Sequence, residues 1–258
     1  MQNKAIFTII QNETYFLKLW MQYYIKYFIP SEIYILNHQS SCKETIDLLE
    51  SYRIKGCNII NLYNDTSFNH QWLNDIVNSF QRFLLLNYKN IVFAEIDEIL
   101  VADPSIYKDG LLGVINHDLS HKRAHGYNLT HYLEEELPFT FDCDPILYQR
   151  KYWHRIGIYD KTLILKEPVL WNIGFHTINA EVQPIQLPGL QLLHLHKFDY
   201  HTCKTRHKEQ ANRNWNHEDL TKNRGYQNRI YEEPAFRSWF YSEWGPRLEM
   251  PDYIRSCI

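Results

Sequence analysis

The sequence predicts an α/β protein in which helices flank a central, mostly parallel sheet. Two observations lead to this prediction. Over the first hundred residues, short apolar runs rich in β-branched residues alternate with amphipathic stretches of helical length, which is the pattern of strand–helix–strand units. The chain has 258 residues, of which 45% are hydrophobic, and this is enough for one sizeable core.

The first strand is expected at residues 5–10 (AIFTII), an apolar run that ends at the polar loop QNET. Residues 15–28 carry apolar side chains at helical spacing. Thr14 is a suitable N-cap for this helix, and Pro30 lies just beyond its end. A buried strand followed directly by an amphipathic helix is the first half of a strand–helix–strand unit.

The same alternation continues through the next sixty residues. Strands are expected at residues 32–37 and 57–63, with a helix between them over 41–56 that closes at a glycine. A long amphipathic helix is expected over 69–88, followed by a fourth strand at 90–101. Parallel pairing of these strands would bring their carboxyl ends to one edge of the sheet.

The second half of the chain is less regular. Further strands are expected at residues 162–168, 181–188 and 190–198, separated by polar loops that contain proline. The chain from residue 199 onward is rich in charged residues, His and Asn. We therefore expect a catalytic domain over residues 1–206 and a helical or irregular C-terminal appendage over 207–258 that packs on the same domain.

Composition excludes several classes of protein. With 27 basic and 30 acidic residues, the chain has no strong field that would draw it to nucleic acid. The five cysteines are widely spread and form no CxxC pair, so neither a disulfide framework nor a cysteine zinc site is expected. No signal peptide and no apolar run of about 20 residues is present. We expect a cytoplasmic protein, at most peripheral to a membrane, and no pattern assigns its oligomeric state.

The stretch NIVFAEIDEILVAD, residues 90–103, places three carboxylates where the fourth strand ends. Alternation along a strand would put Glu95 and Asp97 on one face and Glu98 on the other. Two carboxylates on one face can share a hard divalent cation, which prefers oxygen ligands. The alternative is an exposed acidic turn with no ligand.

The segment FAEIDEILVADP resembles the DxDE segment of family-two-like glycosyltransferases, which have the GT-A fold. The opening segment, residues 7–41, resembles the family's opening, in which KNE follows the first strand and DNxS the second. The segments DPILYQRKYW, IYDKTLILKEPVLWNIGFH and LLHLHKFDY resemble later segments of a bacterial branch. The likeness covers about residues 4–206. It implies an enzyme that uses a nucleotide sugar and a divalent cation, Mn²⁺ or Mg²⁺.

The resemblance implies roles for residues at the predicted sheet edge. Glu95, Asp97 and His196 would hold the metal, with His194 as a further imidazole. The donor would contact Gln11, Asn12, Glu13, Asn37, Arg123 and Lys161. Three positions depart from the family: Glu95 stands where Asp is usual, and Asn37 and Cys42 each replace an acid.

A base is needed to take the proton of the acceptor hydroxyl if the anomeric configuration inverts. Asp160 and His176 are the residues nominated for this role. Asp160 lies in the segment YDK, and His176 follows the turn-forming Gly174. The acidic run Glu134–Glu136 is the alternative, although such runs are usually solvated helix faces.

The resemblance therefore implies transfer of a sugar from a nucleotide-diphosphate sugar, most plausibly a UDP-sugar, to a hydroxyl of a glycan or glycolipid, with inversion, as in polysaccharide biosynthesis. A sugar nucleotidyltransferase is one alternative, but the loop QNETYF lacks the glycine and lysine of a phosphate-binding loop. A module that binds a nucleotide or sugar without catalysis is the other.

Overall fold

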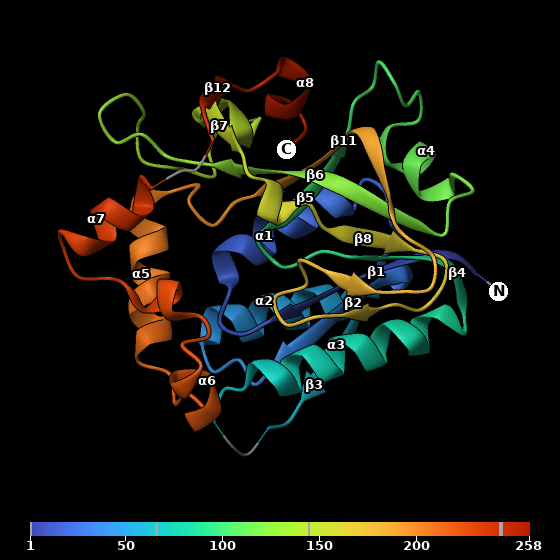
Figure 1. The fold of residues 1–258 in the computed structure, drawn as a ribbon, viewed down its shortest axis with the longest axis horizontal. Helices are drawn as coiled ribbons and strands as arrows, with labels where there is room; N and C mark the ends of the chain where they lie inside the picture. Colours follow the sequence, from blue (N-terminus) through green and yellow to red (C-terminus); the bar gives the residue numbers. More distant parts are fainter. Residues whose placement is uncertain (1, 65–66, 144, 243–244) are drawn as a thin grey trace.

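The computed structural model describes residues 2–64, 67–143, 145–242 and 245–258, and it confirms the predicted α/β class (Figure 1). The strands are β1 (Gln2–Ile10), β2 (Ile33–His38), β3 (Asn58–Leu62), β4 (Tyr88–Phe93), β5 (Glu98–Ala102), β6 (His121–Leu129), β7 (Tyr152–Arg155), β8 (Thr162–Leu165), β9 (Leu170–Trp171), β10 (Ile178–Asn179), β11 (Ile185–His194) and β12 (Arg247–Glu249). The α-helices are α1 (Thr14–Tyr24), α2 (Lys43–Ile54), α3 (His70–Leu85), α4 (Gly110–Asn116), α5 (Tyr200–Ala211), α6 (His217–Thr221), α7 (Ala235–Phe240) and α8 (Asp252–Arg255). Short 3₁₀ turns lie at η1 (Pro30–Glu32), η2 (Ile146–Gln149), η3 (Gly157–Tyr159) and η4 (Tyr226–Arg229).

The first four strands form the parallel half of the sheet, in the order β3-β2-β1-β4. β1 pairs in parallel with β2 and with β4, and β2 pairs in parallel with β3. Their carboxyl ends therefore meet at one edge, as the alternation of strands and helices predicts. None of the helices in the described ranges is both long and apolar enough to cross a membrane.

The other half of the sheet is mainly antiparallel. β8 lies between β4 and β6 and is antiparallel to both. β6 also pairs with β7, antiparallel, and with β11, parallel. A separate two-stranded sheet joins β9 to β10.

The acidic segment differs from the single strand predicted for residues 90–101. β4 ends at Phe93, and residues 94–97 form a turn in which the N–H of Glu98 donates to the carbonyl of Glu95, 2.9 Å away. The chain then continues as β5, which pairs with β11 and not with β4. Glu95 and Asp97 lie in the turn and Glu98 begins β5, and each of the three carboxylates contacts a cation, Lys161 or Arg206.

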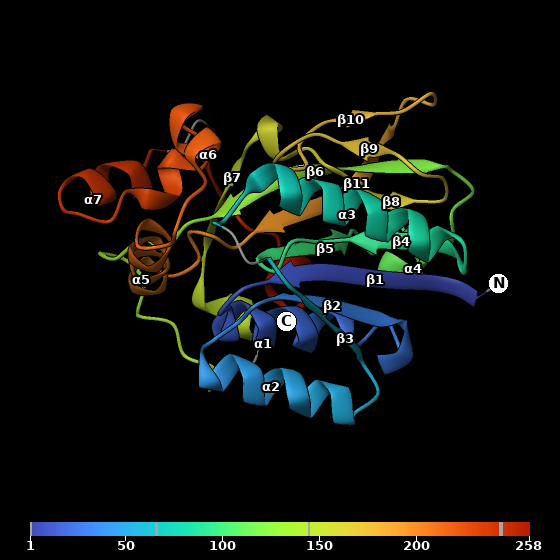
Figure 2. The same ribbon diagram turned by 90° about the horizontal axis from the view of Figure 1, so that it is seen from below.

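Helices cover both faces of the parallel half. Figure 2 shows α1 and α2 on one side of β1 and β2, with α3 on the opposite side. The buried face of α1 includes Trp20, Tyr23 and Tyr24. Tyr23 Oη donates to the carbonyl of Leu100, 2.6 Å away, which ties α1 to β5.

The C-terminal segment gathers at one end of the molecule. Both views place α5, α6 and α7 together at the end of the sheet opposite the N-terminus (Figures 1 and 2). α5 and α7 share a small core of their own, formed by Tyr200, Cys203, Phe236 and Phe240. The predicted domain boundary after Arg206 lies within α5, and β12 adds a strand to the main sheet beside β7.

Candidate active site

A cavity of about 390 Å³ opens at the edge of the sheet where β4 and β11 end. Its wall combines Asp97 from the turn after β4, His194 from β11, Arg206 from α5 and His70 from the start of α3. Ligands of α/β proteins bind at the carboxyl edge of the sheet, and small-molecule sites have volumes of about 300–1,000 Å³. The position and size of the cavity are those of a ligand site.

Two of the donor residues predicted in the loop after β1 line a smaller, neighbouring cavity. Gln11 and Glu13 face this space of about 110 Å³, together with His38 from the end of β2. Asp97 and Arg206 line both cavities. Phe68, Leu73, Glu95, Gln210 and Arg213 also line both, so the two hollows are adjacent along a shared wall.

Asn12 and Asn37 have structural contacts outside both cavities. Asn12 has a positive φ of 56°, which asparagine tolerates better than most residues. Its Oδ1 accepts from the N–H groups of Ser41 (2.8 Å) and Cys42 (2.9 Å). Asn37 Oδ1 accepts from the N–H of Ser40, 3.0 Å away. These contacts hold the loop after β1 against the loop that begins α2.

Arg206 of α5 pairs with two carboxylates at the junction of the cavities. Its Nε donates to Glu13 Oε1 (2.7 Å), and its Nη1 donates to Asp97 Oδ2. Burial alone would raise the pKa of Asp97, but the Arg206 guanidinium outweighs burial and holds this pKa well below its usual range. Burial raises the pKa of Glu13, and Arg206 offsets the shift only in part.

Lys161 pairs with the other two acids of the turn. The side chain of Lys161 is almost fully buried, and its Nζ contacts Glu95 Oε2 and, at 2.6 Å, Glu98 Oε1. Burial raises the pKa of Glu98 to about 7, against the opposing effect of Lys161. Glu95 and Glu98 thus share one cation, whereas Asp97 faces another. This arrangement differs from the strand alternation expected from the sequence.

Asp97, His194 and His196 form a group that fits a divalent cation. Their ligand atoms all lie within 4.8 Å of one another. Asn128 Oδ1 can only accept, so His194 Nδ1, 2.8 Å away, carries the proton. The lone pair of His194 Nε2 then faces Asp97 Oδ2 at 3.9 Å. A carboxylate beside an imidazole lone pair is a donor set suited to a divalent metal, and Glu95 lies outside this group.

The second ring, His196, presents its other nitrogen to the same carboxylate. His207 Nδ1 donates to the carbonyl of Ile230 at 2.8 Å, so His207 Nε2 has a lone pair and accepts from His196 Nε2 at 2.7 Å. His196 Nδ1 therefore has a lone pair, and it lies 3.5 Å from Asp97 Oδ2. Arg206 Nη1 lies 3.2 Å from His196 Nδ1 and also contacts Asp97, so the guanidinium lies between the two ligand atoms.

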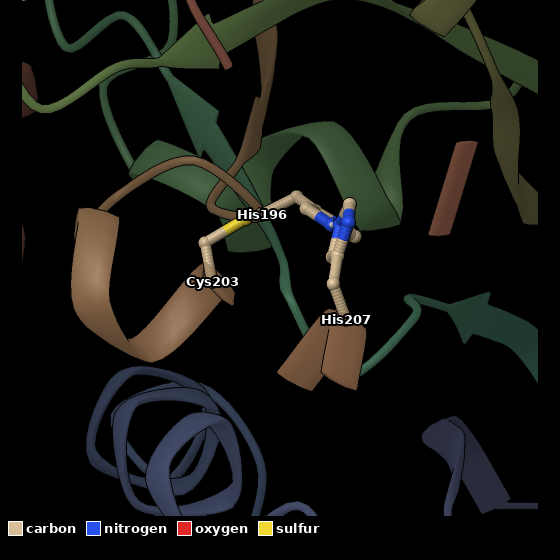
Figure 3. Close-up of side chains that lie close together, drawn as sticks. All are labelled: His196, Cys203 and His207. Atoms are coloured by element: carbon tan, nitrogen blue, oxygen red, sulfur yellow. Dashed lines mark hydrogen bonds between the residues drawn. The ribbon is translucent and has the colours of Figure 1, made fainter. Parts of the chain in front are cut away.

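Figure 3 shows the two imidazoles meeting, with Cys203 beside them. His196, Cys203 and His207 are all buried and close enough together to be considered as a second metal group. However, two nitrogens bound to one tetrahedral zinc ion would lie roughly 3.4 Å apart, given Zn–N distances of about 2.0–2.1 Å. The 2.7 Å separation is that of a hydrogen bond. Cys203 packs in the small core of the C-terminal helices.

The remaining predicted residues differ in their relation to the cavity. His176 lines it, in a loop held by α3: Asn78 Nδ2 donates to the carbonyl of Trp171 at 2.9 Å. Asp160 lies outside it and accepts from Arg155 (2.7 Å), Gln186 (2.8 Å) and the N–H of Gly126 (2.8 Å). Arg123, on β6, also lies outside the cavity wall.

Sequence reasoning did not identify several cavity residues. Arg206 is the main omission, because its charged surroundings in KTRHKEQ indicate a solvated helix. The others come from segments that the sequence showed only as part of a helix or an appendage: His70, Arg213, Trp215, Arg224 and Trp239. The signal that was present is the concentration of basic and aromatic residues between 204 and 239.

The fold and the site together define an α/β protein with a cation-lined ligand cavity at the carboxyl edge of its parallel strands. No protein-family model matches the chain, and no curated protein sequence matches it. Among solved structures, it is similar to residues 1–349 of TarS from S. aureus, with 13% identity and a TM-score of 0.44, over 89% of this chain and 70% of that one.

Two further structures show how wide the similarity is. The same TarS segment in complex with UDP-GlcNAc aligns at 12% identity and a TM-score of 0.34, over 64% of this chain and 45% of that chain. A putative glucose-1-phosphate thymidylyltransferase from Bacillus anthracis, in complex with a sucrose, aligns at 12% identity and a TM-score of 0.31, over 65% and 70%.

Proposed function

We propose that this protein is a metal-dependent glycosyltransferase. It would move a sugar from a nucleotide-diphosphate sugar, with a UDP-sugar as the first donor to test, to a hydroxyl of a glycan or glycolipid acceptor, with inversion at the anomeric carbon. The observation that supports this proposal most is the meeting of the Asp97 carboxylate with two imidazole lone pairs in the cavity wall.

The charges around the cavity suit a diphosphate. Five cations line it: Lys161, Lys197, Arg206, Arg213 and Arg224. Of the acids predicted at the sheet edge, only Glu95 and Asp97 do so. Arginine pairs with phosphate through two donors at once, and Arg213 has no carboxylate partner among the residues that the structure describes. Because Lys161, Arg206 and Arg224 already pair with carboxylates, Arg213 is the arginine that would bind a phosphate of the donor first.

A divalent cation would be held by Asp97, His194 and His196. When bound, it would neutralise charge on the leaving diphosphate. Mg²⁺ strongly prefers oxygen ligands, whereas imidazole suits transition metals. The donor set therefore favours Mn²⁺ over Mg²⁺. Arg206 would release Asp97 in this state and remain paired with Glu13, close to the entering phosphates.

The test is a thermal-shift panel of UDP, GDP, CMP and dTDP, each with and without Mn²⁺. We expect one nucleotide to stabilise the wild-type protein in a Mn²⁺-dependent way. Asp97→Asn should lose the Mn²⁺ dependence, whereas the matched control Asp118→Asn, at an exposed carboxylate, should keep it. Failure of every nucleotide to stabilise the folded wild-type protein would refute the proposal.

One observation favours a second candidate, a nucleotide- or sugar-binding module without catalysis. Every acid of the turn already has a protein cation as partner, Arg206 for Asp97 and Lys161 for Glu95 and Glu98. Such a module would bind a nucleotide with no dependence on metal. It would also release no UDP from UDP-GlcNAc, whereas a transferase slowly hydrolyses its donor when water replaces the acceptor.

A further inference from the structure

His70 and Asp219 form a hydrogen-bonded pair at the rim of the main cavity. His70 is the first residue of α3, and Asp219 lies in α6, 149 residues further along the chain. The distance from His70 Nδ1 to Asp219 Oδ2 is 2.9 Å, and the same oxygen accepts from the backbone N–H of His70 at 2.8 Å. The Asp219 side chain is 1% exposed and the His70 side chain 19% exposed.

The carboxylate fixes which nitrogen of the ring carries the proton. Burial tends to raise the pKa of Asp219, but the His70 hydrogen bonds and Arg224 outweigh it and lower this pKa. Asp219 is therefore ionised and can only accept, so Nδ1 of neutral His70 donates to it. The lone pair is left on Nε2, and none of the described residues donates to this atom.

Only one member of the pair lines the cavity. His70 is part of the cavity wall, whereas Asp219 lies behind it. The Trp215 ring lies 5.5 Å from the imidazole and the Phe68 ring 5.0 Å from it. A Cβ at Gly225 would be only 3.1 Å from His70 Cε1, so glycine is the residue that fits beside this edge of the ring. Since Nδ1 is engaged by Asp219, Nε2 is the polar atom of the ring that remains for a ligand of the cavity.

The groups that face His70 include one competing cation. Arg224 Nη1 donates to Asp219 Oδ1 at 3.2 Å, whereas His70 uses Oδ2. The carboxylate therefore serves both partners through different oxygens. An ionised carboxylate behind an imidazole, with the other nitrogen facing a reaction site, is the arrangement that orients a general base and stabilises it once it is protonated.

The two bases nominated from the sequence are less well placed for this step. Asp160 lies outside the cavity wall and its oxygens are engaged by Arg155, Gln186 and Gly126. His176 lines the cavity, but burial lowers its pKa to about 4, so it is a weak base. Its Nδ1 has no hydrogen-bond partner among the described residues, and so no carboxylate orients the ring.

We propose that His70 is the catalytic base of the transfer and that Asp219 is its positioning residue. This inference rests on the proposed glycosyltransferase function. In the step, the acceptor oxygen forms a bond to the anomeric carbon while its proton passes to His70 Nε2. The bond from that carbon to the diphosphate oxygen breaks, and the diphosphate leaves with the electron pair. Asp219 stabilises the His70 imidazolium until His70 returns the proton to solvent.

The experiment measures UDP release from UDP-GlcNAc and UDP-glucose, with water as acceptor, and UDP binding by calorimetry in the presence of Mn²⁺. We expect His70→Gln to lower kcat about 10²- to 10⁴-fold, the usual contribution of a general base, with KM and the Kd for UDP unchanged. Free imidazole should restore part of the activity of His70→Ala, because the cavity would admit the missing ring.

Asp219→Asn and a matched control separate orientation from folding. Asp219→Asn should lower kcat by about tenfold or more, because the ring loses its fixed tautomer, and leave KM unchanged. His217→Gln, at an exposed position on the same helix, should have no effect. If His70→Gln left kcat unchanged, or weakened UDP binding and not turnover, the role of His70 would be overturned and the proposed function would not. No UDP release by the wild-type protein would overturn the proposed function and, with it, this base.

Discussion

Replacement of Arg206 by alanine is expected to cost about 3–5 kcal/mol of stability, because it leaves buried charge without a partner. Arg206, Glu13 and Asp97 have side chains that are 14%, 10% and 7% exposed. The loss should stay within this range although two carboxylates are affected. Burial already raises the pKa of Glu13, and without Arg206 burial would raise the pKa of Asp97 as well, so both acids can take up protons.

The assay is thermal and urea denaturation with and without Mn²⁺. A chain of this size loses about 2–4 °C of Tm per kcal/mol, so we expect a fall of roughly 10 °C. Mn²⁺ at 100 times its Kd should add about 2.7 kcal/mol to the free energy of unfolding. It should stabilise the variant more than the wild-type protein, in which Arg206 competes with the cation for Asp97.

The control is Arg237→Ala, which removes an exposed pair with Glu134 and should cost at most about 1 kcal/mol. A cost below 1 kcal/mol for Arg206→Ala would show that the two carboxylates do not depend on this guanidinium. Equal stabilisation of both proteins by Mn²⁺ would show that Arg206 and the cation do not compete.

Two further predictions concern positions outside the cavity. Burial lowers the pKa of Lys122 to about 8 from its ordinary 10.5. Between these pH values the folded chain binds fewer protons than the unfolded chain, so the free energy of unfolding should rise with pH. In urea titrations at several pH values, Lys122→Met should lose this rise, and an unchanged dependence on pH would contradict the assignment. A Cβ at Gly126 would lie 2.4 Å from the backbone of Tyr159, so Gly126→Ala should cost about 1–3 kcal/mol or more, measured as a lower Tm. Gly113→Ala, in α4 with no contact closer than 3.6 Å, should instead gain about 0.5–1 kcal/mol, and equal effects at the two glycines would refute the steric explanation.

The parallel half of the fold could be predicted because each element there carries its own local pattern. β1, β2 and β3 are apolar runs, and α1 and α3 have clear apolar faces. β6 was not predicted, because HKRAHGYNL contains few apolar residues and its burial comes from three neighbouring strands and η3. Such burial is a tertiary effect that a sequence window cannot show.

The site was predictable only in part. Asp97 and the two histidines 97 and 99 residues further on were indicated by their residue types and spacing. Their partner Arg206 comes from a helix 109 residues beyond Asp97, and the partner of His70 lies 149 residues away. No local pattern encodes these pairings. The turn at residues 94–97 could not be predicted either, because the cations that stabilise it belong to distant segments of the chain.

The separate core of α5 and α7 has a consequence for how the cavity exchanges with solvent. Tyr200, Cys203, Phe236 and Phe240 bury one another apart from the main core. Cooperative units with few buried contacts open at lower free energy than the sheet on which they rest. Amide hydrogens of the segment 200–241 should therefore exchange before those of β1 and β4. One wall of the cavity would open while the rest of the chain stays folded, which would widen the route by which a bulky acceptor reaches the site.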